Sequence, residues 1–277
     1  MIYLMSLSKI SKLSIAALTF VTPLASATVV EFTTSHGNFK VNLHDEATPE
    51  TVSNFLKYVT DGDYNNTIIH RTVDNFIIQG GGAKFEGSLP PTWIETRPTI
   101  KNEPVYSNVL GTIAMAKIGR QENSATSQWY INLADNSAGS AQLDIQNGGF
   151  TVFGEIIENG MTTIDAIAAV PRCDINSNNN SSIEGPFSAL PMPDYSVDDC
   201  ANKSVPGVDN FVTIVSVDIT DSSVNSADSL SPVKNTSLPV TPPVTPEPPK
   251  SSSGGGSIAW FGLAFAALVS MRRFLKK

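Results

Sequence analysis

The chain has 277 residues, of which 41% are hydrophobic and 16% are charged, and its net charge is −8. This length allows one domain of ordinary to large size, or two small ones, around a packed core. Nucleic acid is not expected as a partner, because phosphate binding requires clustered Lys and Arg side chains and the body of the chain has no long basic run.

The first 27 residues have the features of a secretory signal peptide. Two lysines precede an apolar stretch over residues 13–24, and residues 25–27 (Ala-Ser-Ala) supply the small side chains that signal peptidase requires. A buried first helix is the alternative, which the short apolar stretch disfavours. We therefore expect an exported mature chain that begins near Thr28.

The predicted folded domain covers residues 28–220 and begins with a hairpin and a helix. Alternating runs at residues 29–34 and 39–43 predict two strands with a turn at a glycine between them. Thr48 is a candidate N-cap, Pro49 suits the first helical position, and apolar side chains then recur at helical spacing.

Further strands and a second helix complete the predicted domain. The strands fall at residues 68–73, 76–79, 112–117, 128–133, 151–157 and 211–219, and the helix at residues 160–170. Eight antiparallel strands suffice to close a barrel that is filled by its own side chains. The predicted fold is therefore mainly β, a closed eight-stranded antiparallel β-barrel capped by two α-helices, which binds its substrate on the outer wall.

Residues 171–207 interrupt this pattern with a polar segment that holds both cysteines of the chain, Cys173 and Cys200. We expect a loop insertion that one disulfide closes, because an exported protein meets an oxidising compartment. Two unpaired thiols are the alternative. A zinc site is not expected, because the sequence has neither a CxxC pair nor a neighbouring histidine.

Side-chain oxygens at alternate positions of residues 174–182 resemble the beginning of a calcium loop. Asn179 stands where such a loop has glycine, and no acidic residue stands at the twelfth position. The prediction is therefore that the chain binds no metal.

The end of the chain has three parts. Residues 221–256 are rich in Ser, Pro and Gly and predict an extended linker, and residues 257–277 hold an apolar run followed by a basic cluster. This basic cluster would stay cytoplasmic, which places the domain on the far side of the membrane. The tail resembles the GlyGly-CTERM sorting signal of Gram-negative bacteria, which implies cleavage by a rhomboid-type intramembrane protease. A membrane anchor that is never cut is the alternative.

Two stretches hold candidate functional residues. In the first, Arg71 lies within an apolar strand pair and three glycines follow at residues 80–82. A charged side chain in such a place is costly unless something uses it, and glycines allow a backbone to approach a ligand closely. In the second, alternation places Gln128, Tyr130 and Asn132 on one strand face. Each pattern alone is equally typical of an outward-facing polar strand.

Taken together and in this order, the two stretches resemble the signature of the cyclophilin family of peptidyl-prolyl cis/trans isomerases, most closely its bacterial periplasmic branch. The resemblance spans about residues 29–172 and 207–219. It implies that Arg71 is the principal catalytic residue and that Phe76 and Gln79 act beside it. It also implies a set of substrate-binding residues: His70, Ile77, Ala116, Lys117, Gln128, Tyr130, Gln142, Leu143 and Phe150.

Three of these positions depart from the family pattern. Tyr130 stands where the proline pocket usually has Phe, Gln142 where a large aromatic residue is usual, and Phe150 where His or Tyr is common. The change at Gln142 implies weak binding of cyclosporin-like ligands.

The resemblance implies an enzyme that rotates X-Pro bonds of exported polypeptides without a cofactor, and nothing in the sequence points beyond a monomer. Its expected location is the periplasm or cell envelope, tethered by the C-terminal segment or displayed at the cell surface after cleavage. A proline-peptide-binding chaperone module with little turnover is the alternative function, because Gln142 and the insertion are positioned to alter or cover the groove.

Overall fold

The computed structural model describes residues 27–175, 186–223 and 230–238, and the structural statements below concern these residues. They all belong to one compact unit of the chain. The predicted signal peptide, apart from Ala27, and the C-terminal apolar segment lie outside the described residues. Within the described part, no helix is long and apolar enough to cross a membrane.

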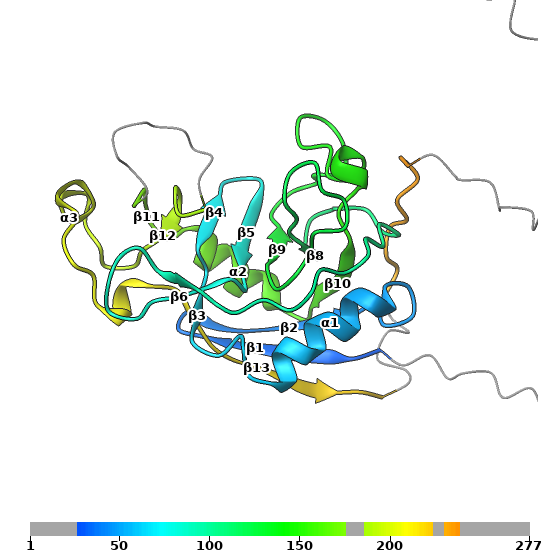
Figure 1. Cartoon of the computed structure of the whole chain (residues 1–277), viewed down its shortest axis with the longest axis horizontal. Coiled ribbons are helices and arrows are strands. Elements are labelled where there is room, and N and C mark those ends of the chain that lie inside the picture. The colour runs from blue at the N-terminus through cyan, green and yellow to red at the C-terminus, as the bar shows by residue number, and fades with distance from the viewer. Residues whose placement is uncertain (1–26, 176–185, 224–229, 239–277) are drawn as a thin grey trace, which may run out of the picture. The chain divides into compact units, whose positions relative to one another are not determined.

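The domain is mainly β, with few helices and one strongly curled antiparallel sheet (Figure 1). The strands follow the order β4-β5-β9-β8-β10-β2-β1-β13-β3-β6-β7. Their bounds are β1 Val29–Thr34, β2 Gly37–Leu43, β3 Thr67–Ile68, β4 Arg71–Val73, β5 Ile77–Gly80, β6 Ala83–Lys84, β7 Thr92–Trp93, β8 Thr112–Met115, β9 Trp129–Asn132, β10 Val152–Ile157 and β13 Thr213–Asp221.

The prediction of a closed eight-stranded barrel is not confirmed, because the sheet has eleven strands and is open, with β4 and β7 at its edges. The predicted strand over residues 68–73 divides into β3 and β4. The reason lies in the backbone: the amide of Ile69 donates to Val212, whereas the amide of His70 donates to Gln79. Neighbouring residues thus bond to opposite parts of the sheet, and the chain itself joins these two parts.

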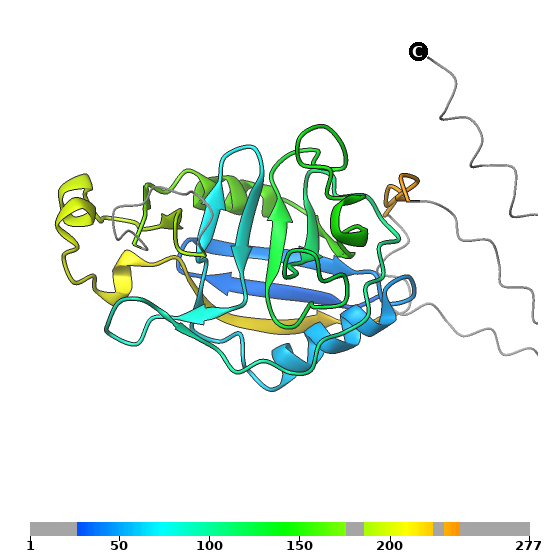
Figure 2. The same cartoon turned by 45° about the horizontal axis from the view of Figure 1, so that its top comes forward.

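Two α-helices pack on the sheet where the hydrophobic pattern predicted them. α1 (Pro49–Thr60) lies against β13, and α2 (Gly160–Ala168) lies against β2 and β10 (Figure 2). The predicted cap, Thr48, makes no side-chain capping bond. Instead the carboxylate of Glu103 accepts hydrogen bonds from the amides of Glu50 and Thr51 at 3.3 and 2.9 Å. A distant acidic side chain therefore caps the start of this helix.

The main core fills the concave side of the sheet and is rich in aromatic rings. The Phe32 ring stacks on Phe39 at 4.6 Å and meets the edge of Trp129 at 5.2 Å, and all three side chains are buried. Ile78 and Ile131 belong to the same cluster. Because side chains alternate along a strand, the residues next to these two face the outer side of the sheet.

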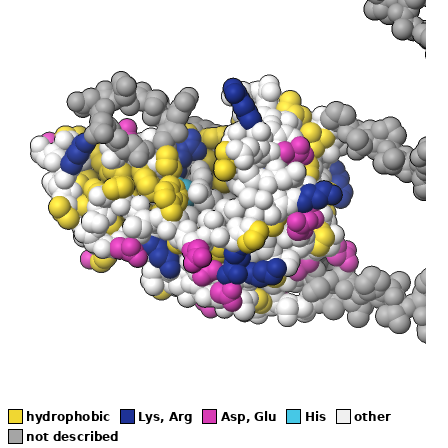
Figure 3. Space-filling view, in the orientation of Figure 1, with side chains coloured by type: hydrophobic (Ala, Val, Ile, Leu, Met, Phe, Trp, Pro, Cys, Tyr) yellow, Lys and Arg dark blue, Asp and Glu magenta, His cyan; other side chains and the backbone are white. Residues whose placement is uncertain are grey.

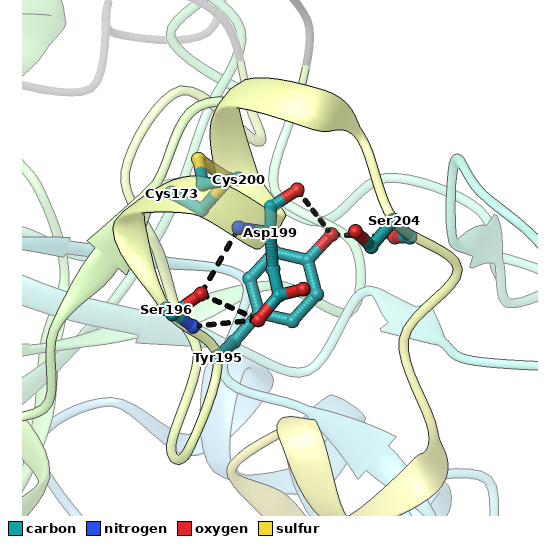
Figure 4. The surroundings of a disulfide bond; sticks show 6 residues. All are labelled: Cys173, Tyr195, Ser196, Asp199, Cys200 and Ser204. Carbon is teal, nitrogen blue, oxygen red and sulfur yellow. Dashed lines mark hydrogen bonds between the residues drawn. A yellow bond between two sulfur atoms is a disulfide. The ribbon is translucent and has the colours of Figure 1, made fainter.

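The insertion forms a small unit beside β4. It contains β11 (Arg172–Cys173), β12 (Leu190–Pro191) and a short helix α3 (Val197–Asn202), which the hydrophobic pattern did not predict. The expected disulfide joins Cys173 to Cys200 (Figure 4). In the same view, Ser196 and Asp199 cap α3 reciprocally, and the hydroxyl of Tyr195 donates to the carbonyls of Asp199 and Ser204.

Residues 230–238 fall inside the predicted linker but lie against the domain. The amide of Ser107 donates to Val233, and the amide of Asn235 donates to Val105, at 2.8 and 3.0 Å. The ammonium group of Lys234 lies 4.3 Å over the Tyr106 ring. Part of the segment predicted as an extended linker is therefore held by backbone pairing and by a cation–π contact.

Candidate functional site

One row of outward-facing residues crosses the sheet from β4 to β9. Arg71 pairs with Gln79, and Gln79 in turn pairs with Tyr130. The neighbouring Ile78 and Ile131 face the core, so the three row residues point to the outer side. The register therefore brings together two residues predicted as catalytic and one predicted to bind substrate.

Arg71 is a half-buried cation whose donors are available on the outer face. Among the described residues its side chain forms no ion pair and no hydrogen bond. Burial lowers the pKa of Arg71 from its ordinary value, but a guanidinium still stays charged at neutral pH. Such a group is suited to donate hydrogen bonds to an electron-rich atom of a bound molecule.

Apolar side chains gather beside this row and form what we call the outer cluster: Ile77, Ala114, Tyr130, Leu143 and Val152, with Phe76, Ala116 and Phe150 packed against them. The Tyr130 and Phe150 rings meet edge to face at 6.0 Å. The cluster brings together six residues that the sequence placed at the site, and it offers an apolar surface next to the guanidinium.

The hydroxyl of Tyr130 has a hydrogen-bond partner although the ring is buried. The hydroxyl of Tyr130 donates to Oδ1 of Asn108 at 2.7 Å, and burial raises the pKa of Tyr130 well above its usual value. The neutral hydroxyl therefore remains at any physiological pH. This bond explains how Tyr is accommodated where the resemblance led us to expect Phe.

Asn108 and Asp144 support the loop that carries Leu143, and the sequence analysis missed both. The backbone amide and the side-chain amide of Asn108 donate to Oδ1 of Asp144 at 2.8 and 3.0 Å. The amide of Phe150 donates to the carbonyl of Leu143 at 2.9 Å. No local pattern identifies such partners, since Asn108 and Asp144 are 36 residues apart.

A hydrogen bond joins the side-chain amides of Gln79 and Gln128, both of which were predicted site residues. Nε2 of Gln79 donates to Oε1 of Gln128 at 2.9 Å. A side chain at Gly82 would meet Gln128 at 2.7 Å, and one at Gly81 would meet the Trp129 ring at 2.5 Å. The glycines therefore allow the backbone to pass close to Trp129 and Gln128, which is a packing role.

The remaining predicted residues differ in exposure. Gln142 is exposed, has a positive φ of 49° and stays outside the outer cluster. Lys117 is half-buried and covers the Phe150 ring at 4.7 Å. His70, predicted to bind substrate, is 0% exposed and lies behind the surface, where burial lowers its pKa to about 4.

The described residues contain no group of three or more side chains able to hold a metal ion. Most of the candidate calcium loop at residues 174–182 lies outside the described residues.

Comparisons with known proteins agree on one family. A family model described as cyclophilin type peptidyl-prolyl cis-trans isomerase/CLD matches residues 29–184. Peptidyl-prolyl cis-trans isomerase B of Escherichia coli (strain K12) is 41% identical over 145 residues, which are 51% of this chain and 85% of that protein. Peptidyl-prolyl cis-trans isomerase A of Dickeya dadantii (strain 3937) is 37% identical over 184 residues, which are 64% of this chain and 87% of that protein.

Among solved structures, a cyclophilin type peptidyl-prolyl cis-trans isomerase of Cryptosporidium parvum is 22% identical, with a TM-score of 0.47. The match covers 71% of this chain and 99% of the other.

Proposed function

Since the chain belongs to the family of cyclophilin type peptidyl-prolyl cis-trans isomerases, we propose that it accelerates rotation about X-Pro bonds with Arg71 as its principal catalytic residue. The observation that carries this proposal is the row of Arg71, Gln79 and Tyr130 beside the outer cluster. In this arrangement the charged donor of Arg71, the amide of Gln79 and the apolar outer cluster lie side by side.

The reaction requires no bond to be broken, but it is slow. Partial double-bond character gives rotation about the peptide bond a barrier of about 18–20 kcal/mol, and uncatalysed X-Pro exchange takes roughly tens to hundreds of seconds. On the way to the twisted state the amide loses its resonance. Electron density then gathers on the prolyl nitrogen, which becomes a hydrogen-bond acceptor only at that point.

Arg71 donates a hydrogen bond to this nitrogen as its lone pair appears. Because the interaction is strongest in the twisted state, it lowers the barrier instead of merely binding the substrate. A reduction of ~7 kcal/mol corresponds to about five decades in rate.

The outer cluster holds the proline ring and excludes water around the rotating bond. Phe76, Tyr130 and Leu143 supply apolar surface, while Gln79, oriented by its bond to Gln128, meets the peptide backbone. One side of the substrate is thereby fixed while the other turns. Water exclusion also strengthens the hydrogen bond from Arg71, since a low dielectric favours it.

The test is an isomerase assay, coupled to proteolysis or to refolding, on the wild type and the Arg71→Ala variant. We expect kcat/KM to fall by about 100- to 1,000-fold, the cost typical of removing one transition-state donor. Arg120→Ala is the matched control, because Arg120 is an exposed arginine at a turn. Equal rates for wild type and Arg71→Ala would reject the role. Peptide binding without any rate enhancement would identify the chain as a binding module.

We further propose that the protein is exported and that its tail is a processed sorting signal of the GlyGly-CTERM type. The sequence of residues 1–27 supports export, and a disulfide between Cys173 and Cys200 fits an oxidising compartment. Mass spectrometry of the native protein from separated cell fractions tests both points. Intact termini in the cytoplasmic fraction would reject export, and an intact C-terminus in the membrane fraction would indicate a permanent anchor.

A further inference from the structure

A pair of stacked aromatic rings lies next to the catalytic row. Trp93 of β7 is 47% exposed, and its ring stacks on Phe187 of the insertion at 5.0 Å with an angle of 21°. We call this pair the aromatic shelf. It joins a residue of the sheet edge to a residue of the disulfide-closed insertion.

The aromatic shelf begins one side chain away from the proposed site. A side chain at Gly82 would meet Gln128 at 2.7 Å and the ring of Trp93 at 3.0 Å, so both side chains border the same point of the backbone. The ring of His70, which precedes Arg71, lies edge-on to Trp93 at 5.5 Å. The shelf is therefore continuous with the row formed by Arg71, Gln79 and Tyr130.

The exposed ring is held in place rather than free to move. Trp93 pairs with Ala83, and the amide of the following Ile94 donates to the carbonyl of Gly82 at 2.9 Å. With Phe187 stacked on it and the buried His70 beside it, the ring has a fixed orientation. A fixed aromatic surface binds an apolar side chain at little cost in conformational entropy.

Trp93 lines a hollow whose other walls are mostly polar or charged, among them Lys84, Glu86 and Arg97. Hydrophobic side chains also gather over the end of the molecule where β6, β11, β12 and α3 lie (Figure 3). The exposed ring of Trp93 therefore supplies a large apolar contact inside a mainly polar hollow.

We propose that the aromatic shelf is an additional subsite that binds an aromatic or large aliphatic side chain of the polypeptide substrate. This rests on the proposed function, since the occupant is the same chain whose prolyl bond lies at Arg71. Trp93 borders Gln128, which bonds to Gln79 of the row, and an extended peptide advances about 3.3 Å per residue. We therefore assign the bound side chain to a residue within about three positions of the proline. The subsite gives the enzyme a preference among X-Pro sequences, and it depends on Phe187 of the insertion.

The experiment compares peptides that share one X-Pro bond but carry either Phe or Ser at the second and third positions on each side of it. For the wild type we expect a Phe peptide to be preferred by about tenfold in kcat/KM, through KM, as one aromatic contact would give. Trp93→Ala abolishes the preference and leaves kcat/KM for the Ser peptides unchanged. The Trp93→Phe variant retains most of the preference for Phe peptides. Val215→Ala is the matched control, because Val215 is also 47% exposed but lies on β13.

Two outcomes overturn the proposal: a wild type without preference, or a Trp93→Ala variant that loses the same factor on both kinds of peptide. Trp93→Thr, which suits a strand, replaces Trp93→Ala if the latter does not fold. Calorimetry measures the affinity for the same peptides without turnover. The preference for Phe peptides and its loss in Trp93→Ala are expected there too. A protein that binds Phe peptides preferentially but rotates none would support the aromatic shelf and reject the proposed catalysis, so the two failures are distinguishable.

Discussion

The ammonium group of Lys117 lies 4.7 Å over the ring of Phe150, which packs against the outer cluster. The same group donates hydrogen bonds to the carbonyls of Asn147 and Gly149 at 2.8 and 2.6 Å. Burial disfavours its charged form and lowers the pKa of Lys117 to about 8. A single positive charge at the edge of the site therefore titrates close to physiological pH.

We predict that this charge makes substrate binding pH-dependent. Below pH 8 the ammonium group attracts an acidic side chain placed next to the X-Pro bond, and above pH 8 this attraction is lost. KM for Glu-containing peptides should therefore rise between pH 7 and 9, with a midpoint near 8, whereas KM for neutral peptides stays level. Lys117→Gln should give a flat profile for both. A midpoint that persists in this variant would assign the titration to another group.

A second prediction concerns the segment that follows β13. Nδ2 of Asn235 donates to the carbonyl of Asp144 at 2.9 Å, and Asp144 in turn anchors Asn108 beneath Tyr130. Asn235→Ala removes this hydrogen bond and the one that Oδ1 of Asn235 accepts from the amide of Ser237, so the free energy of unfolding should fall by about 1–2 kcal/mol. Because Leu143 adjoins Asp144, KM should rise with little change in kcat.

Two further variants make this test specific to the side-chain amide. Asn235→Asp places a carboxylate against a carbonyl oxygen and should cost more than Asn235→Ala. Ser237→Ala is the control, since Ser237 is exposed and contacts Asn235 only through its backbone amide. If Asn235→Ala changes neither unfolding by urea nor KM, the segment does not position the loop.

The strand faces were predictable from the sequence because they depend on a local, two-residue repeat. Alternation alone placed Gln128 and Tyr130 on one strand face, and the register adds that Tyr130 lies opposite Gln79. The break between β3 and β4 was not predictable, since residues 68–73 contain no glycine or proline that would mark an interruption of the strand. Only the partners Val212 and Gln79, which are distant in sequence, decide where the backbone changes sides.

The candidate site was predicted from the family resemblance rather than from local pattern. Leu143 lies in a loop without periodicity, and its place in the outer cluster depends on Asn108 and Asp144. These are hydrogen bonds between loops, and the residue types involved are common in any loop. The burial of His70 also depends on distant residues, because Trp93 and Phe187 cover its ring.

A third prediction concerns the disulfide of the insertion. Cys173 and Cys200 are 27 residues apart, and closing a loop of this length contributes about 3–4 kcal/mol through the lost entropy of the unfolded chain. The double variant Cys173→Ala/Cys200→Ala should therefore unfold at a lower urea concentration. The expected loss is at most this amount, since a reduced unfolded chain retains some structure.

The insertion also pairs with the strand that carries Arg71. The amide of Thr72 donates to Ala189 at 2.8 Å, and Arg172 forms a two-point ion pair with Asp74. We expect faster hydrogen exchange at the Thr72 amide in the double cysteine variant. Dithiothreitol should reproduce both effects in the wild type and have no effect on the double variant. Unchanged exchange at Thr72 would show that the insertion holds β4 without the disulfide.

A fourth prediction follows from two buried histidines. His70 and His44 are 0% and 7% exposed, and burial lowers the pKa of each to about 4, with Lys234 adding to the effect at His44. In the unfolded chain both titrate near the ordinary value of 6.5. As the pH falls from 6.5 to 4, the unfolded chain therefore takes up protons that the folded protein does not.

Stability should consequently decline through this pH range, by roughly 3 kcal/mol for each histidine if the full shift is expressed. Urea unfolding at intervals from pH 7 to pH 4 measures the slope. His44→Gln/His70→Gln should flatten it, whereas His36→Gln, at the turn between β1 and β2, should leave it unchanged. An equal slope in the double variant and the wild type would assign the acid sensitivity to carboxylates, since their protonation destabilises the fold in the same direction.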